Sequence, residues 1–423
     1  MEKVRYNLLK LSEHHKLFHG KKVLVIGAGA VGTHEMERIA KLGCSVEAVD
    51  LDYFTLENAA KHSGIIRTPE DAGRNKAVCS AERLAPLLDE GCTSNGIDCD
   101  VCKLGPEALA DYEYIFIAVD NYAAKILINN LVLQLPKERR PIVIMSGTYN
   151  ELAQSVILNF EDFCIRCLTD ESWLINGHVR TSCTGPQIRR IEGVDTVIRT
   201  SNLASSMAAH LALEQFRASV IGIDKAMNRR LTYTAYPNLE LSSSIPMKKS
   251  KCPGCAICAP KEIKWLKGSV LDVTLRDAFE QITEILGSDD YEMVVHKLEY
   301  SEIVYGKFIV EASCFCCGKK IKVMKHEGRT FLKDLLCDEC ADKESETWER
   351  KVDKTGNLIK GFTTTSGEEL LNKTLFDLGY PLGAHILVKQ RNGALDDLDT
   401  DKTVTTYFAF DGDHEKMHSI KSL

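Results

Sequence analysis

The sequence predicts an α/β fold with a mostly parallel sheet, followed by a smaller α+β region. Short apolar runs typical of buried parallel strands recur along the first part of the chain, and segments with helical periodicity separate them. Strands that alternate with helices form parallel sheets whose faces the helices cover. The apolar runs span residues 22–26, 45–49, 114–119 and 141–145, and the helical segments lie near residues 8–19, 36–42, 78–88 and 126–135.

Less regular elements follow this alternation. We expect a strand at 155–160, a loop-like stretch at 164–193, an Ala-rich helix at 203–216 and β structure at 231–241. Beyond a boundary near residue 260 we expect a helix at 271–286, strands at 293–300 and 307–312, a hairpin at 348–362, and a helix at 368–375 before a strand that ends at 388. These elements predict three domains, at residues 1–258, 263–343 and 344–423.

Composition restricts the class of protein. The 423 residues include 53 Lys or Arg and 60 Asp or Glu, and the resulting net charge of −7 offers no basic excess for nucleic acid or an anionic membrane. No apolar run approaches the roughly 20 residues that span a membrane, and no apolar signal segment opens the sequence. We therefore expect a cytoplasmic protein that binds neither nucleic acid nor a membrane.

A glycine loop follows the first predicted strand and opens a helix. Gly27-x-Gly29-x-x-Gly32 allows a tight turn and a close backbone approach, and the amides at a helix N-terminus suit a phosphate. Asp50, about 20 positions on, suits the ribose hydroxyls of a nucleotide. The alternative is a strand, turn and helix that bind no ligand.

Further polar residues distinguish between kinds of nucleotide chemistry. A dinucleotide-binding enzyme needs little beyond Asp50, whereas nucleotidyl transfer needs cations that neutralise polyphosphate and a carboxylate that holds Mg²⁺. Two lysines and an aspartate directly after a strand meet that need, although each lysine alone is also typical of a solvated surface. The additional residues are Asp52, Asn58, Lys61, Lys76 and Asp120.

Segments 23–52, 58–62, 73–77 and 119–121 resemble, in this order, the adenylation domain of ubiquitin-like-protein activating enzymes. The adenylyltransferases of molybdopterin and thiamine biosynthesis share this domain. The resemblance covers residues 1–258 and implies a Rossmann-like fold, ATP and Mg²⁺, and a homodimer. It also implies that the C-terminal glycine of a ubiquitin-like protein attacks the α-phosphate.

The resemblance assigns a role to each polar residue. Asp50 would hold the ribose, Asn58, Lys61 and Lys76 the phosphates, and Asp120 the magnesium ion. The family usually has Arg where Lys61 stands, so that a two-pronged phosphate contact becomes a point charge.

Two Cys-x-x-Cys pairs, separated by 84 residues, predict a first zinc site at Cys164, Cys167, Cys252 and Cys255. Four thiolates satisfy tetrahedral Zn²⁺, and each pair places its sulfurs on one side of a turn. Spacing alone leaves Cys258 as an alternative ligand and a redox dithiol as an alternative function, and the family resemblance selects Cys252 and Cys255.

A second pair of Cys-x-x-Cys motifs encloses 19 residues, the spacing of a compact zinc ribbon. Its ligands would be Cys314, Cys317, Cys337 and Cys340, with Cys316 as the spare cysteine. We expect the metal to be needed for the folding of this module.

Cys183 lies in a polar loop 16 positions after Cys167, close to Arg180. A thiol near a cation can have a lowered pKa, and the thiolate is the nucleophile. The resemblance places the thioester cysteine of activating enzymes at this position, although sulfur-carrier adenylyltransferases also have a cysteine here.

Residues 344–423 resemble a β-grasp domain, because a short helix, a Leu-Gly turn and a strand follow one another there. In activating enzymes such a domain recruits a conjugating enzyme, and a plain structural cap is the alternative. The favoured hypothesis is therefore an activating enzyme that adenylates a ubiquitin-like protein, with Lys61 and Lys76 assisting catalysis. The enzyme then holds the ubiquitin-like protein as a thioester on Cys183 and passes it to a conjugating enzyme. The alternatives are a sulfur-carrier adenylyltransferase, an NAD-dependent oxidoreductase and a zinc-based scaffold.

Overall fold

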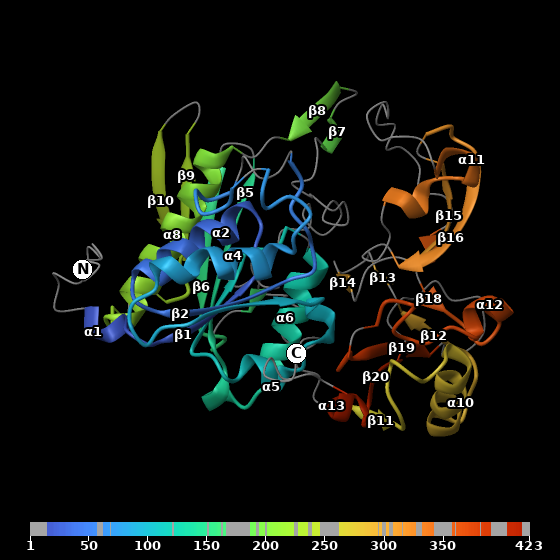
Figure 1. Ribbon diagram of the computed structural model, residues 1–423. Coiled ribbons are helices and arrows are strands. Elements are labelled where there is room, and N and C mark those ends of the chain that lie inside the picture. The colour runs from blue at the N-terminus through green and yellow to red at the C-terminus, as the bar shows by residue number, and fades with distance from the viewer. Residues whose placement is uncertain are drawn as a thin grey trace. The chain divides into compact units, whose positions relative to one another are not determined.

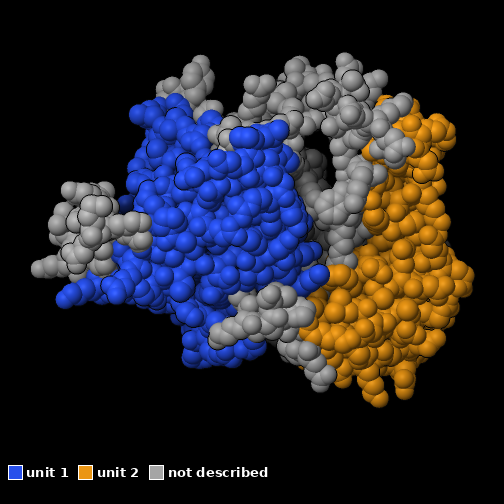
Figure 2. All heavy atoms as spheres, viewed as in Figure 1, with its two compact units in different colours: residues 1–169, 180–258, 418–423 blue, residues 170–179, 259–417 orange. Residues whose placement is uncertain are grey.

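The chain forms two compact units, drawn in different colours in Figure 2. Unit 1 comprises residues 1–169, 180–258 and 418–423, and unit 2 comprises residues 170–179 and 259–417. The computed structural model describes residues 15–56, 62–67, 69–120, 122–149, 152–161, 164–165, 187–191, 194–198, 201–223, 227–235, 239–245, 262–294, 296–297, 302–303, 308–314, 316–326, 332–341, 358–359, 361–380, 382–390 and 404–416.

Unit 1 is built on an eight-stranded sheet in the order β10-β9-β6-β5-β4-β1-β2-β3. The five strands from β5 to β3 are parallel, and β6, β9 and β10 extend the sheet with antiparallel pairs. The strands are β1 Lys22–Ile26, β2 Ser45–Asp50, β3 Ser94–Asp98, β4 Tyr114–Ile117, β5 Ile142–Tyr149, β6 Leu152–Leu158, β9 Arg230–Thr234 and β10 Glu240–Ser244. The predicted mostly parallel α/β fold is thereby confirmed (Figure 1).

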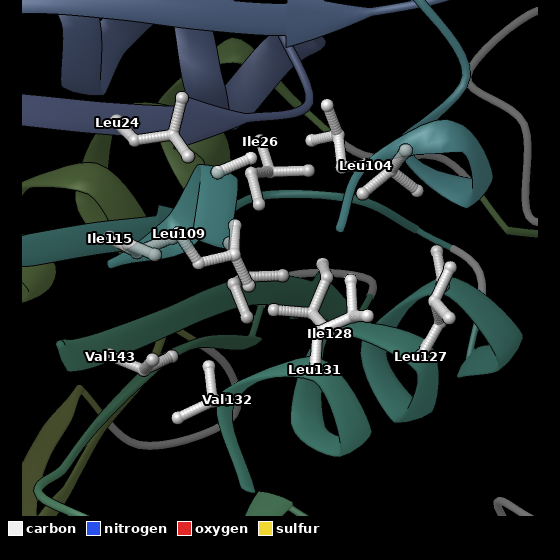
Figure 3. Close-up of a cluster of buried hydrophobic side chains, with 14 of the residues drawn as sticks. Leu24, Ile26, Leu104, Leu109, Ile115, Leu127, Ile128, Leu131, Val132 and Val143 are labelled. Atoms are coloured by element: carbon white, nitrogen blue, oxygen red, sulfur yellow. The ribbon is translucent and has the colours of Figure 1, made fainter. Parts of the chain in front are cut away.

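Helices cover both faces of this sheet, because each parallel strand must return to the same edge through a crossover. The helices are α1 His15–Phe18, α2 Ala30–Lys41, α4 Lys76–Leu84, α5 Pro106–Leu109, α6 Tyr122–Gln134 and α8 Asn202–Val220. On one face α5 and α6 pack on the strands, where Leu24 and Ile115 meet Leu109, Ile128 and Leu131 (Figure 3). On the other face α2, α4 and α8 form a second core. No helix among the described residues is both long and apolar enough to cross a membrane.

Three strands of unit 1 have no counterpart among the strands expected from the sequence. β3 has no apolar run, since it is the edge strand of the sheet and only Ile97 of its five residues is buried. β7 Gln187–Ile191 lies in the stretch expected to be loop-like, and it pairs as a hairpin with β8 Val194–Ile198, which follows that stretch. The β structure expected at 231–241 is also a hairpin, formed by β9 and β10.

Unit 2 is built on a five-stranded mixed sheet in the order β11-β20-β19-β12-β18. Its elements are β11 Lys264–Leu266, α10 Leu275–Leu286, β12 Tyr291–Val294, β18 Gly361–Phe362, α12 Glu368–Leu371, β19 Ile386–Gln390, β20 Val404–Phe410 and α13 Asp413–Lys416. Thr274 caps α10 in a reciprocal capping box with Asp277, and Gly287 ends the helix in the left-handed conformation. One large core joins α10 to this sheet.

A smaller three-stranded sheet, in the order β16-β15-β17, lies between β12 and β18 in the sequence. Its elements are β15 Phe308–Ser313, β16 Lys320–His326, α11 Asp338–Ala341 and β17 Leu358–Ile359, and a separate pair is formed by β13 His296–Lys297 and β14 Glu302–Ile303. We call residues 308–341 the ribbon.

The ribbon shares the core of the five-stranded sheet. Phe308, at the start of β15, is fully buried in that core, with its ring centroid 6.2 Å from that of Phe362 on β18. Met324 also packs there; it has a φ of 52° at an irregularity in the β15–β16 pairing, a conformation uncommon for a residue other than glycine. The two sheets of unit 2 are therefore packed as one body.

The expected division of unit 2 at residue 344 does not coincide with this architecture. The five-stranded sheet takes β11 and β12 from before that position and β18, β19 and β20 from after it. Within the hairpin expected at 348–362, β17 pairs with β15 and β18 pairs with β12, and the remaining residues lie outside the described part of the chain. Pairing across a long insertion leaves no local signal in the sequence, which explains the difference.

The shared core of unit 2 predicts the effect of Phe308→Ala. Truncating a buried phenylalanine typically costs about 3–5 kcal/mol, and here the loss should spread into the five-stranded sheet. Hydrogen exchange of the full-length protein should show faster exchange in β12 and β19 as well as in β15. Ile309→Ala is the matched control, because Ile309 packs in the ribbon's own cluster and should loosen β15 and β16 alone. Unchanged exchange in β12 and β19 of Phe308→Ala would contradict the shared core.

Candidate functional site

The loop between β1 and α2 needs glycine at two positions. Gly27 has a φ of +96°, and a Cβ there would lie 2.9 Å from the backbone nitrogen of Val119. A Cβ on Gly32 would overlap the carbonyl oxygen of Gly27. The two glycines therefore let α2 start directly against the end of β1.

Gly29 lacks such a packing reason. It is the residue before α2, its φ is −78°, and a Cβ on it would meet no heavy atom of the chain within 4 Å. No side chain caps α2, and its first turn has no acidic residue. The first backbone amides of α2 thus have no side-chain cap from Gly29, an arrangement that suits a phosphate.

Three candidate residues meet beside this loop. The carboxylate of Asp50, at the end of β2, accepts hydrogen bonds from the amides of Ala28 (2.7 Å) and Asp52 (2.8 Å). Burial raises the pKa of Asp50, and the nearby Lys76 ammonium opposes this rise. Lys76 is the first residue of α4, is 5 % exposed, and places Nζ 3.3 Å from Oδ2 of Asp52. The structure thus brings Asp50, Asp52 and Lys76 together, next to Gly27 and Gly29.

Asp120 lies at the same edge of the sheet. It follows β4, which is the parallel neighbour of β1, and the amide of Ala118 donates to the carbonyl of Ile26. Burial lowers the pKa of Lys125 on α6, and the carboxylate of Asp120 opposes this fall. Lys125 is a cation near the site that the sequence analysis does not identify.

The loop before α4 is held by Asp71, whose side chain is fully buried. Burial alone would raise its pKa, yet hydrogen bonds from Arg83 and from the amide of Arg67 lower the pKa of Asp71 to about 2. Next along this loop, the amide of Lys76 donates to the carbonyl of Asp52 (2.8 Å). These contacts connect the start of α4 to the segment after β2.

A second buried acid lies one turn behind the glycine loop. Glu35 on α2 is fully buried; its Oε1 accepts a 2.6 Å hydrogen bond from Ser146 on β5, and its Oε2 has no hydrogen-bond partner among the described residues. Burial raises the pKa of Glu35 to about 8, against the hydrogen bond from Ser146 and the charge of Arg38. The sequence analysis does not identify this residue, because its position on a helix face predicts a core or surface contact only.

Several candidate residues lie outside the described part of the chain. They are Asn58, Lys61, Cys167, Cys183, Cys252 and Cys255. Of the first predicted zinc site, only Cys164 is described, and it is 4 % exposed in the core beneath α6. The roles expected of these residues stay predictions.

The four cysteines of the ribbon do come together. The Sγ atoms of Cys314, Cys317, Cys337 and Cys340 all lie within 4.8 Å of one another, and those of Cys317 and Cys337 are 3.6 Å apart. A tetrahedral zinc ion with Zn–S bonds of about 2.3 Å separates its sulfurs by roughly 3.8 Å, so the cluster fits the metal.

The backbone around the cluster is typical of metal-binding knuckles. The amide of Cys337 donates to Sγ of Cys314 (3.3 Å), and a hydrogen bond to sulfur favours the thiolate that binds zinc. Gly318, directly after the first pair, has a φ of +76° and donates its amide to the carbonyl of Cys314. A turn of this shape holds both sulfurs of the pair on one side.

Comparison with known proteins identifies a family. The sequence matches the ThiF family over residues 2–270. No protein in the curated set matches it. Among solved structures it is similar to E. coli MccB with ATP, at 16 % identity over 58 % of this chain and 68 % of that chain, with a TM-score of 0.43. It is also similar to E. coli MccB with MccA (16 %, 58 % and 68 %, TM-score 0.44) and to PaaA (17 %, 56 % and 67 %, TM-score 0.42).

The buried acid behind the glycine loop predicts a pH dependence of stability. Burial raises the pKa of Glu35 to about 8 in the folded state, whereas the ordinary pKa of a glutamate is 4.5. The folded state binds more protons between these values, so stability that is fully present at the acidic end is lost as the pH rises toward 8. The free energy of unfolding of the wild-type protein should decline by up to roughly 1.4 kcal/mol per pH unit in this range. Denaturant titrations of Glu35→Gln should show no such decline. An equally steep decline in the variant would contradict this prediction.

The cysteine cluster predicts one zinc ion in the ribbon. Cys340→Ser removes a thiolate that is 1 % exposed, and it should reduce the zinc content of the purified protein by one ion per chain. Cys316→Ser is the matched control, since Cys316 is exposed and lies outside the cluster of four. Metal analysis checks both variants, and an unchanged zinc content in Cys340→Ser would rule out the site.

Proposed function

Because the chain belongs to the ThiF family over residues 2–270, we propose that it uses ATP to activate the C-terminal glycine of a ubiquitin-like protein. The observation that carries this proposal is the uncapped start of α2, next to which Asp50 accepts a hydrogen bond from the amide of Ala28 and Lys76 pairs with Asp52. Such a site offers amide donors and a cation to phosphates and a carboxylate to a ribose.

Adenylation is the first proposed step. A carboxylate oxygen of the partner's terminal glycine attacks the α-phosphorus of ATP, the bond from that phosphorus to the bridging oxygen breaks, and pyrophosphate leaves. The product is an acyl adenylate. Asp50 and Asp52 belong to the ribose side of the site, and Lys76, with Asn58 and Lys61, to the phosphate side.

Asp120 is the proposed ligand of Mg²⁺, which neutralises charge on the phosphates when it is bound. The position of Asp120 supports this role, because it follows β4 at the same edge of the sheet as Gly27 and Asp50. Lys125 supplies a further positive charge near this carboxylate.

The second proposed step transfers the acyl group to Cys183. The thiolate attacks the acyl carbon of the adenylate, and AMP leaves with the electron pair of the broken bond. A conjugating enzyme then takes the acyl group from this thioester, and the C-terminal part of unit 2 is the proposed docking module. We also propose a homodimer and a first zinc site at Cys164, Cys167, Cys252 and Cys255.

Exchange of pyrophosphate with ATP tests the adenylation step. With a glycine-terminated ubiquitin-like partner, the wild-type protein should catalyse exchange, and Lys76→Ala or Asp120→Asn should reduce the rate by about 10²–10³-fold, because each removes charge that stabilises the transition state. Lys22→Ala is a control, since Lys22 is an exposed lysine at the opposite end of β1.

Cys183→Ala separates the two steps of the proposal. It should leave pyrophosphate exchange intact and abolish the thioester conjugate between the protein and its ubiquitin-like partner, which is recognised because added thiols cleave it. Exchange without any such conjugate in the wild-type protein would favour adenylation of a sulfur carrier instead. Binding of NAD without binding of ATP would overturn the proposed function.

A further inference from the structure

Asn75, the residue before α4, makes contacts on both sides of the candidate site. It is 7 % exposed, and its Oδ1 accepts a hydrogen bond from the amide of Val78 (3.1 Å), which caps the helix. Its Nδ2 donates to the main-chain carbonyls of Asp50 (2.9 Å) and Asp52 (3.3 Å). The side chain therefore connects the start of α4 to the end of β2. We call the two hydrogen bonds from Nδ2 of Asn75 the clamp.

These three partners allow only one orientation of the amide. Oδ1 faces a donor and Nδ2 faces two acceptors, and the reverse orientation would place an oxygen against two carbonyl oxygens. Both N–H groups of Nδ2 are thus engaged by residues of the nucleotide site. A capping residue needs only the oxygen, so the two N–H contacts require another explanation.

Backbone contacts show what the clamp adds. The amide of Phe54 donates to the carbonyl of Arg74 (2.9 Å), and the amide of Lys76 donates to that of Asp52 (2.8 Å), so residues 52–54 are already paired with residues 74–76. At the carbonyl of Asp50 this pairing ends. Asn75 extends the connection to that residue, whose carbonyl otherwise accepts only a 3.4 Å contact from the amide of Cys99 among the described residues.

We propose that Asn75 is a positioning residue that holds the ribose side of the nucleotide site, at Asp50, at a fixed distance from the phosphate side, at Lys76. This inference rests on the proposed function. A ligand that spans both sides gains affinity when its two anchoring groups are held at the right separation. A ligand that reaches only one side gains nothing from the clamp.

Asn75→Ser separates the clamp from the helix cap. Serine caps a helix about as well as asparagine, but its hydroxyl cannot supply the two N–H donors. Asn75→Thr is a second variant with a hydroxyl cap and no N–H donor in the side chain, in case the first folds poorly. Asn75→Ala removes cap and clamp together.

The experiment compares two ligands on the full-length protein by calorimetry, each with Mg²⁺. ATP carries both ribose and phosphates, whereas inorganic tripolyphosphate carries phosphates alone. In Asn75→Ser the affinity for ATP should fall about tenfold, while the affinity for tripolyphosphate stays within about twofold. The thermal midpoint should stay near that of the wild type in Asn75→Ser and fall in Asn75→Ala.

Thr274→Ala is the matched control, because it removes the capping box of α10, which belongs to unit 2. It should change stability and leave the affinities for both ligands unchanged. Equal losses for ATP and tripolyphosphate in Asn75→Ser, or no loss for either, would overturn the role of Asn75 while leaving the proposed function in place. A wild-type protein that binds tripolyphosphate and not ATP would overturn the proposed function and the clamp with it.

Discussion

The contact between Gly27 and Gly32 is the constraint on which the candidate site depends. Helix α2 can begin at the end of β1 only because neither residue has a side chain where the two backbones meet. This close start directs the first amides of α2 at the space beside Gly29, and it brings the amide of Ala28 to the carboxylate of Asp50. The polar residues of β2 and α4 then lie beside a helix N-terminus whose position the backbone has already set.

How much of the fold could be predicted depends on where each strand lies in the sheet. β1, β2, β4 and β5 are central and buried, so their apolar runs predict them. β3 lies at the edge and alternates little, and in the β7–β8 hairpin the apolar residues are interrupted by charged and polar ones, so neither has a continuous apolar run. In unit 2, pairing between β12 and β19 spans the whole ribbon, and no local pattern reports a contact at that separation.

The candidate site was predictable where side-chain chemistry follows chain order. Asp50, Asp52 and Lys76 meet as their spacing suggests, and the four ribbon cysteines cluster as their spacing requires. No sequence pattern marks Glu35 or Lys125, because burial decides the properties of both, and Ser146 and Asp120 are neighbours that only the fold brings to them. The capping role of Asn75 could have been read from an asparagine just before a helix, but its contacts with two carbonyls of another segment could not.

The junction between β17 and β18 has a mechanical consequence. Ile359 pairs with the ribbon and Gly361 with the five-stranded sheet, so one residue separates the two sheets along the chain. So short a connection cannot extend further. Any rotation of the ribbon relative to the five-stranded sheet would have to break hydrogen bonds between strands or remove Phe308 from the core. Unit 2 should therefore behave as one stiff body that presents its cysteine cluster and its larger sheet to any binding molecule at a constant angle.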